Sequence, residues 1–387
     1  MPSARALAAL GCLLLGLGGC SSGGAEGPSP TSASATSSTA APTPADPVAE
    51  ALAGLDRRGQ VEQLFLAGVR LDDLSPGTSL AMSGVGGIFL AGRSQAPATE
   101  LAATVQGWQS EAPGPGLWVA ADQEGGQVQA LQGPGFEPLP SALEQGALPP
   151  AELAALADRL GASLHDAGVN LDLAPVVDIV PPGTESANPP IGAVDRQYGG
   201  TAAQVVAAAG AVVDGLAAHQ VTATLKHFPG LGRVQGNTDT AATVTDSVTT
   251  ADDEQVAAFA TLARNPAEPF VMASSATYTQ LDPAGPAAFS PAVLTGLLRD
   301  RLGFDGVVVS DDVGNAAAVA GVPAGERATR FIAAGGTLVL TVDATLVPEM
   351  IDAVLARDEG DPAFAAQVDT AVRTALAAKA RAGLLPG

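Results

Sequence analysis

Ionisable side chains stand at the ends of several short apolar runs of this chain. Asp122, the pair Lys226 and His227, and Asp311 each end such a run, and Asp172 lies inside another. A carboxylate held rigidly at the mouth of a buried strand can act as a nucleophile or as an acid or base. Lysine and histidine donate hydrogen bonds to hydroxyl groups. These residue types predict chemistry on a neutral, hydroxyl-rich ligand.

Each of these segments also has a purely structural interpretation. An aspartate after a strand often caps the following helix, and residues 226–230 (KHFPG) and 122–126 (DQEGG) could form ordinary turns. The paired glycines of the second segment would also let backbone approach a ligand closely. In the doublet Asp311-Asp312 we expect Asp312 to act as the cap and Asp311 to point inward.

The elements that carry these residues alternate between strands and helices. Continuous apolar runs are typical of strands that are buried on both faces, and Ala-rich stretches that end near glycine are typical of helices. The predicted strands are 87–90, 117–121, 169–173, 221–225, 270–273, 307–309 and 337–340, and the predicted helices are 151–167, 202–219, 252–264, 291–302 and 324–334.

This alternation predicts an α/β fold, either a closed (β/α)8 TIM-type barrel or an open, doubly wound sheet. A barrel gathers residues from every strand onto one face, whereas an open sheet concentrates its site at one switch point. Because four separate strands deliver ionisable groups, we favour the barrel, as a single catalytic domain over residues 47–387.

Composition excludes several classes of function. With 18 Lys+Arg against 40 Asp+Glu, the formal charge is −22, which would repel nucleic acid. The chain has no P-loop, no dinucleotide fingerprint and no G-x-S-x-G elbow. Its three histidines, His165, His219 and His227, do not have the spacing of a zinc cluster. We therefore expect no metal and no cofactor.

The first 46 residues predict export and tethering. Arg5, the apolar run 6–18 and a small-residue pair before Cys20 are typical of a signal peptide over residues 1–19 that ends in a lipobox. A short membrane anchor, or a signal cleaved elsewhere, is the alternative. Residues 20–46 are rich in Ser, Thr, Ala and Pro and predict a disordered linker. We expect an extracytoplasmic lipoprotein, anchored to the membrane by a lipid on Cys20, whose mature domain has no thiol.

Five segments, in this order, resemble glycoside hydrolase family 3. They are residues 122–129, 170–178, 191–196, 226–230 and 309–312. The chain is most similar to the single-domain bacterial β-N-acetylglucosaminidases that act on cell-wall fragments, and the resemblance extends from about residue 55 to residue 385. It implies a (β/α)8-type barrel and a carbohydrate substrate, and we expect a monomer.

The resemblance also implies a retaining mechanism, in which an aspartate attacks the anomeric carbon and forms a glycosyl-enzyme. By motif position that nucleophile is Asp311. Asp122, Arg196, Lys226 and His227 fall on positions that hold sugar hydroxyls in the family. Their chemistry fits, because a carboxylate accepts hydroxyl protons while Arg and Lys donate.

The chain departs from the family where an acid/base histidine is expected after residues 226–230. Counted without a gap, Asp239 takes the histidine's place, and a carboxylic acid can serve as proton donor if its pKa is raised. Counted by residue type, Ala241 takes that place and no proper acid remains. Gln127 and Ala130 also replace basic residues of the family motif.

Two hypotheses follow. In the first, the chain is an exo-acting, retaining β-N-acetylhexosaminidase with Asp239 as the candidate acid/base. In the second, it is a catalytically impaired, glycan-binding lipoprotein on the same barrel.

Overall fold

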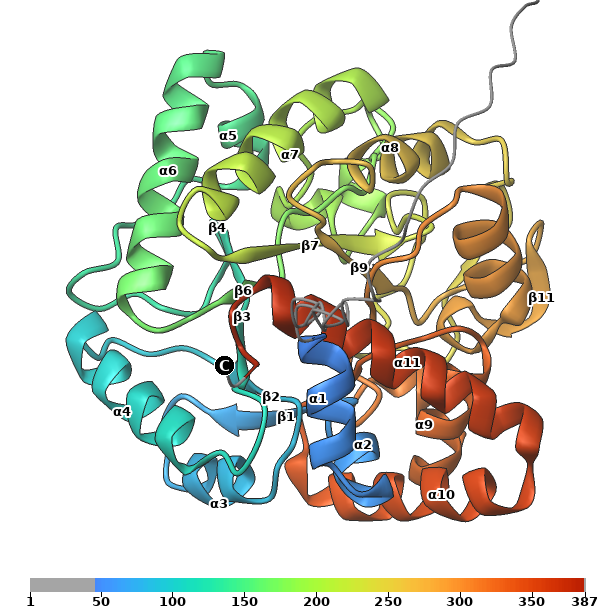
Figure 1. Cartoon of the computed structure of the whole chain (residues 1–387). Helices are drawn as coiled ribbons and strands as arrows, with labels where there is room; N and C mark the ends of the chain where they lie inside the picture. Colours follow the sequence, from blue (N-terminus) through green and yellow to red (C-terminus); the bar gives the residue numbers. More distant parts are fainter. Residues whose placement is uncertain (1–45, 386–387) are drawn as a thin grey trace, which may run out of the picture. The chain divides into compact units, whose positions relative to one another are not determined.

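Eight parallel strands follow one another around a ring in the computed structural model, which describes residues 46–385 (Figure 1). The strand order is β12-β9-β7-β6-β3-β2-β1-β13, and a bridge from Val309 to Leu338 joins the two ends of this sheet. The strands are β1 (Phe65–Arg70), β2 (Gly87–Ala91), β3 (Trp118–Ala121), β6 (Leu171–Asp172), β7 (Thr222–Phe228), β9 (Phe270–Ala273), β12 (Val308–Ser310) and β13 (Val339–Thr341). The predicted (β/α)8 barrel is thus confirmed.

One barrel strand, β1, was not among the predicted strands. Its sequence, FLAGVR, is interrupted by Ala67 and Gly68, which weaken the apolar run. Glycine is required at position 68, because a Cβ there would lie 2.2 Å from the carbonyl oxygen of Val342, which directly follows β13. The small residue that obscures the strand in the sequence is therefore what lets β1 pack in the barrel.

Helices surround the barrel, and all five predicted helices are present. The helices are α1 (Pro47–Gly54), α2 (Arg57–Glu62), α3 (Pro76–Met82), α4 (Ala98–Glu111), α5 (Ala142–Gly146), α6 (Pro150–Asp166), α7 (Ala202–Ala217), α8 (Glu254–Leu262), the π-helix η4 (Ala292–Arg301), α9 (Ala324–Ala333), α10 (Val347–Gly360) and α11 (Pro362–Arg381). Gly168, Gly303 and Gly335, expected at helix ends, all have positive φ. Among residues 46–385, no helix is both long and apolar enough to span a membrane.

Short elements outside the barrel shape the loops that follow the strands. A hairpin of β4 (Gln123–Gly125) and β5 (Val128–Gln129) follows β3, and a small sheet combines β8 (Thr245–Asp246), β10 (Thr277–Tyr278) and β11 (Asp282–Pro286). Single turns of 3-10 helix are η1 (Glu185–Ala187), η2 (Gly192–Val194), η3 (Ala287–Phe289), η5 (Ala317–Val319) and η6 (Ala344–Leu346).

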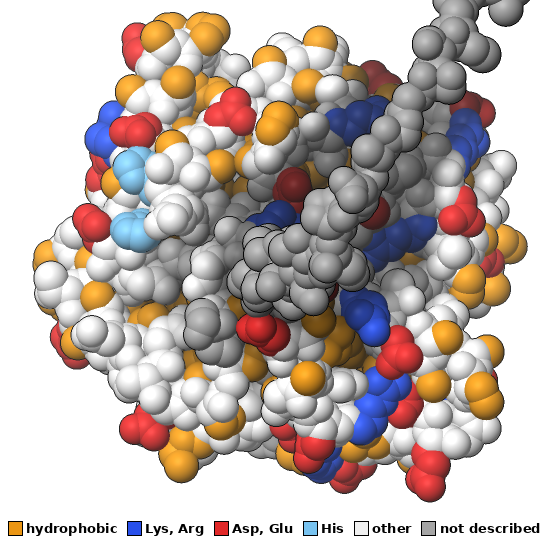
Figure 2. Space-filling view, viewed as in Figure 1, with side chains coloured by type: hydrophobic (Ala, Val, Ile, Leu, Met, Phe, Trp, Pro, Cys, Tyr) orange, Lys and Arg blue, Asp and Glu red, His pale blue; other side chains and the backbone are white. Residues whose placement is uncertain are grey.

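The amino ends of the strands are covered by α11, which crosses the ring in Figure 1. The Gly116 N–H, just before β3, donates to the Leu384 carbonyl just after α11, over 2.6 Å. Basic and acidic side chains lie close together on this face of the molecule (Figure 2). On α2, Arg58 pairs with Asp352 and Arg57 with Asp358. This end of the barrel is therefore closed, and a ligand must enter at the carboxyl ends.

The predicted signal peptide, lipobox at Cys20 and linker lie almost entirely outside the described residues, which begin at Asp46.

Candidate active site

A pocket of about 310 Å³ lies at the carboxyl ends of the strands. Every residue that the sequence proposed for catalysis or sugar binding lines it, from the end of β7 and from the loops after β3, β6, β7 and β12. These residues are Asp122, Arg196, Lys226, His227, Asp239 and Asp311. The barrel thus brings together side chains that are up to 189 positions apart, counted from Asp122 to Asp311.

Lys226 lies at the centre of a buried ion cluster. Its Nζ is 2.6 Å from Asp122 Oδ1 and 2.5 Å from Glu124 Oε1. The guanidinium of Arg196 binds both oxygens of Glu124, through Nε at 2.8 Å and Nη2 at 2.7 Å. Glu124 is therefore the link between the two cations that face the pocket.

The charges of this cluster stabilise one another against burial. Burial favours neutral Glu124, but Arg196 and Lys226 outweigh it and lower the pKa of the carboxyl to about 2. Burial likewise opposes the charged form of Lys226, but Asp122 and Glu124 prevail and raise its pKa. The cluster is ionised at neutral pH and presents fixed donors and acceptors to the pocket.

Asp178 holds His227 and the turn that follows it. This fully buried carboxylate is 2.7 Å from His227 Nδ1, and it accepts hydrogen bonds from the backbone N–H groups of His227 and Leu231. The Gly230 N–H closes the turn on the His227 carbonyl over 2.7 Å. Residues 226–230 thus form the turn that the structural interpretation expected, and this turn also presents two side chains to the pocket.

The doublet after β12 divides its roles, although Asp312 holds a turn and does not cap a helix as the sequence predicted. Asp312 accepts hydrogen bonds from the backbone N–H groups of Gly314, Asn315 and Val342. Asp311 lines the pocket, and one of its oxygens accepts the Asp312 N–H over 2.8 Å. Burial raises the pKa of Asp311, as does the charge of Asp239, whereas His227 lowers it.

The loop that carries Asp239 is fastened to the loop that follows Asp311. The backbone N–H groups of Ala317 and Ala318 donate to the carbonyls of Asp239 and Thr238, over 3.2 and 3.0 Å. Asn237 accepts the Asp239 N–H through its side chain. Residues 237–239 line the pocket. Asp239 is solvent-exposed, and its side chain shares the pocket with Asp311 without a hydrogen-bond partner among residues 46–385.

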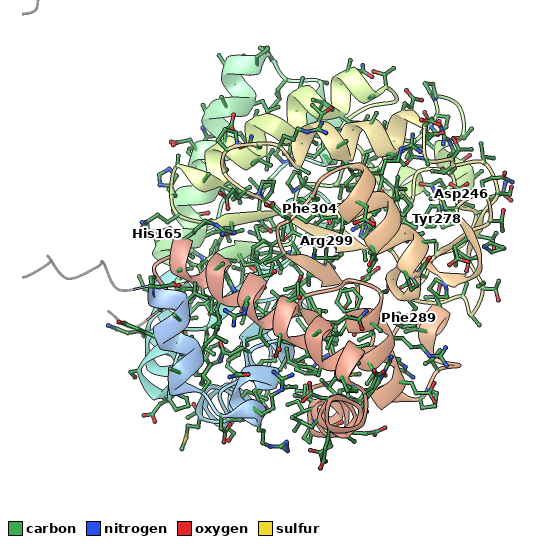
Figure 3. All side chains as sticks on the ribbon, turned by 45° about the vertical axis from the view of Figure 1, so that its right-hand side comes forward. His165, Asp246, Tyr278, Phe289, Arg299 and Phe304 are labelled. Carbon is green, nitrogen blue, oxygen red and sulfur yellow. The ribbon has the colours of Figure 1, made fainter. Side chains whose placement is uncertain are left out.

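The other two histidines lie away from the pocket, in or just after the outer helices. His165 is in the last turn of α6 (Figure 3), and His219 follows α7, with its Nε2 2.9 Å from Asp158. Among residues 46–385, His227 is the one histidine that lines the pocket.

Asp172, which the sequence also singled out, does not line the pocket. It is fully buried beneath the pocket, and one oxygen accepts the Gln123 N–H over 3.1 Å. Its other oxygen has no hydrogen-bond partner among the described residues. Burial raises the pKa of this carboxyl to about 8, so it carries a proton at neutral pH.

Two positioning residues, Glu124 and Asp178, were not assigned any role from the sequence. Both lie inside quoted motifs, but neither ends a strand, and the sequence offers no sign that they turn toward Arg196, Lys226 or His227. Their buried carboxylates could be recognised only from their partners.

A larger hollow, of about 670 Å³, lies between η4, α9 and α11. Arg299 and Phe304 line it and lie side by side in Figure 3. The guanidinium of Arg299 donates hydrogen bonds to the carbonyls of Phe304, Gly306 and Gly335 and to the Thr337 hydroxyl. Arg299 therefore stabilises the loops before β12 and β13. The described residues that line this hollow include no pair of catalytic groups.

Within residues 46–385, no group of three or more His, Cys, Asp or Glu side chains is arranged to hold a metal ion. The charged groups of Asp122, Arg196 and Lys226 are instead paired within the ion cluster around Glu124.

Comparison with known proteins agrees with this arrangement. The family model described as "Glycosyl hydrolase family 3 N terminal domain" matches residues 58–377. A beta-hexosaminidase of Stenotrophomonas maltophilia (strain K279a) is 35% identical over 283 residues, which cover 68% of this chain and 77% of that protein.

Solved structures show the same likeness. The β-N-acetylhexosaminidase from Beutenbergia cavernae DSM 12333 is 47% identical, with a TM-score of 0.80 over 84% of this chain and 99% of that one. A glycoside hydrolase family 3 β-N-acetylglucosaminidase from Paenibacillus sp. str. FPU-7 is 28% identical, with a TM-score of 0.76 over 86% of this chain and 64% of that one. This chain is therefore a glycoside hydrolase and belongs to glycosyl hydrolase family 3.

Proposed function

We propose that this chain is a retaining, exo-acting β-N-acetylhexosaminidase that releases terminal aminosugars from cell-wall-derived glycans. The observation that carries the proposal is that Asp311 faces the same pocket as Asp122, Arg196 and Lys226. The relatives named β-hexosaminidase and β-N-acetylhexosaminidase support this class of substrate.

In the first step, a carboxylate oxygen of Asp311 attacks the anomeric carbon. The bond from that carbon to the leaving oxygen breaks, and Asp239 gives its proton to the leaving oxygen. In the second step, water attacks the anomeric carbon and returns a proton to Asp239. The bond from that carbon to Asp311 breaks as the water attacks, which frees the sugar and restores the carboxylate.

The ion cluster would hold the sugar while this happens. Asp122 is about one third exposed and can accept hydroxyl protons, and Lys226 and Arg196 keep N–H groups that are not used by Glu124. Because these groups are fixed by one another, they need little reorganisation in the transition state. We expect a bell-shaped dependence of kcat/KM on pH, since Asp311 must be ionised and Asp239 protonated.

The first test uses p-nitrophenyl N-acetyl-β-D-glucosaminide as substrate. Wild type should turn it over, Asp311→Asn should lose at least about a thousandfold in kcat, and a 2-fluoro sugar should label Asp311. Asp300 on η4 is exposed and has no ion pair among residues 46–385, so Asp300→Asn is a matched control that should retain full activity.

A second test concerns the proton donor. Asp239→Asn should lose about a hundredfold on a methyl glycoside, whose leaving group needs protonation, and much less on the p-nitrophenyl glycoside. Equal losses on both substrates would contradict this role of Asp239.

The exposed position of Asp239 favours the second candidate, a glycan-binding protein without turnover. In that case N-acetylglucosamine should bind to wild type and to Asp311→Ala alike, with no product formed by either.

We also propose that the enzyme is held at the outer face of the membrane by a lipid on Cys20, because residues 6–20 have the pattern of an exported lipoprotein. Labelled palmitate should be incorporated into wild type and not into Cys20→Ser. Equal incorporation would contradict the anchor.

A further inference from the structure

We propose that a second hollow, next to the catalytic pocket, binds an anionic substituent on the terminal sugar, with Arg93 as the group that recognises it. This inference rests on the proposed function. The hollow measures about 400 Å³ and is lined by Gly92, Arg93, Asp122 and residues 127–130. Asp122 and Val128 line both spaces, so the two are adjacent.

The position of this hollow decides which part of the sugar reaches it. Asp122 follows β3 and Asp311 follows β12, and in the closed ring these strands are four steps apart in either direction. The two carboxylates therefore face each other across the barrel mouth. A sugar whose anomeric carbon is at Asp311 extends its hydroxyl-bearing side toward Asp122.

All residues that line the second hollow come from the loops after β2 and β3. It therefore lies beyond Asp122, on the side opposite the scissile bond. A group carried on a ring hydroxyl of the terminal sugar can enter it, whereas the leaving group cannot.

The charges of the hollow favour an anion. Arg93 is exposed, and its Nη2 donates to the Gln127 carbonyl. Within residues 46–385 it forms no ion pair, unlike Arg57, Arg58 and Arg70. A guanidinium has five N–H donors, so most of those of Arg93 remain available.

The neighbours of Arg93 do not compete with such a ligand. The nearby Asp122 is already neutralised by Lys226 at 2.6 Å. The Gln127 side chain is exposed and, among the described residues, makes no hydrogen bond, so its amide can add a further donor. A guanidinium with available donors beside a hollow suits a sulfate, phosphate or carboxylate group.

The test is calorimetric titration of the full chain with four sugars: N-acetylglucosamine, its 6-sulfate, N-acetylmuramic acid and the neutral disaccharide N,N′-diacetylchitobiose. The sulfate and the muramic acid carboxylate distinguish the two kinds of anion. We expect wild type to bind at least one of them about tenfold more tightly than N-acetylglucosamine.

In Arg93→Gln, the affinity for that anionic sugar relative to the affinity for N-acetylglucosamine should fall about tenfold. Arg373 is also an exposed arginine, but on α11, so Arg373→Gln is the matched control and should keep the wild-type ratio. Three results would overturn the proposal. The ratio of affinities could be unchanged in Arg93→Gln, wild type could bind both anionic sugars more weakly than N-acetylglucosamine, or only the neutral disaccharide could bind more tightly than N-acetylglucosamine. Failure of the proposed function is distinguishable, because wild type would then not turn over the nitrophenyl glycoside, whereas the ratio of affinities tests Arg93 by binding alone.

Discussion

The chain has two lysines, and both are buried, at opposite ends of the barrel. At the carboxyl end, Lys226 contacts the carboxylates of Asp122 and Glu124. At the amino end, Lys379 of α11 has a single side-chain partner among the described residues, the amide oxygen of Gln63 at 2.6 Å. The same residue type, equally buried, therefore has two different electrostatic environments.

The difference appears in the two pKa values. For Lys226, two carboxylates outweigh burial and raise the pKa. For Lys379, burial is unopposed and lowers the pKa to about 7. The comparison shows that burial alone does not identify a site: Lys226 is one of several mutually paired charges that face a pocket, and Lys379 packs a helix against the closed end.

The largest effect should come from Glu124→Gln, which removes the charge that Arg196 and Lys226 share. Two buried cations would then have one carboxylate, Asp122. We expect the free energy of unfolding to fall by about 4 kcal/mol, measured by urea denaturation. Glu100 on α4 is exposed, and Glu100→Gln should change it by less than about 0.5 kcal/mol.

The second largest effect should come from Lys226→Met. We expect a loss of about 3 kcal/mol in stability and about a hundredfold in kcat/KM on the nitrophenyl glycoside, because Asp122 and Glu124 lose a charged partner. Lys379→Met should leave kcat/KM unchanged. Comparable losses of activity in both variants would contradict the distinction between the two lysines.

The pH dependence of stability tests Lys379 directly. Its folded pKa of about 7 lies below the ordinary value of 10.5, so between these values the unfolded chain binds more protons than the folded one. Stability of wild type should therefore rise relative to Lys379→Met as pH increases, by about 2 kcal/mol between pH 7 and 9. Parallel pH profiles of the two proteins would show that Lys379 is not perturbed.

The smallest effect concerns Asp172, whose folded pKa is raised to about 8 from 3.8. Here the folded state binds more protons, so the contribution to stability is complete below about pH 4 and is lost as pH rises toward 8. Asp172→Asn removes this dependence. Relative to wild type, its free energy of unfolding should rise by about 1 kcal/mol between pH 5 and 6, again from urea titrations. A constant difference would mean that Asp172 ionises normally.

Much of the barrel could be predicted from apolar runs and glycine positions, because strands buried on both faces leave a plain pattern. Seven of the eight strands were predicted in this way. Strand β1 was not, because Gly68 interrupts its apolar run, and this glycine is required by the close approach of Val342, which is distant in sequence. Helix ends at Gly168 and Gly335 were predictable, because their positive φ is a local backbone requirement.

The residues that line the pocket were likewise accessible from the sequence. Asp122, Lys226 and Asp311 end strands, and parallel strands in a barrel deliver their carboxyl ends to one face. The position of a residue at a strand end does not indicate which side chain will bind it. Glu124 and Asp178 bind side chains from the segments of neighbouring strands, and Arg93 comes to the Gln127 carbonyl from the loop after a different strand.

The sequence by itself determined the family, the barrel and the side chains that meet at its mouth, since these depend on local pattern and ordered motifs. Only the tertiary structure decided which charges are paired, which carboxyl stays protonated and which lysine is left without a counterion. Those properties depend on distance and burial between residues far apart in the chain, as for Lys379 and Gln63, which are 316 positions apart. Electrostatic energy is set by that spatial arrangement, and residue order alone does not specify it.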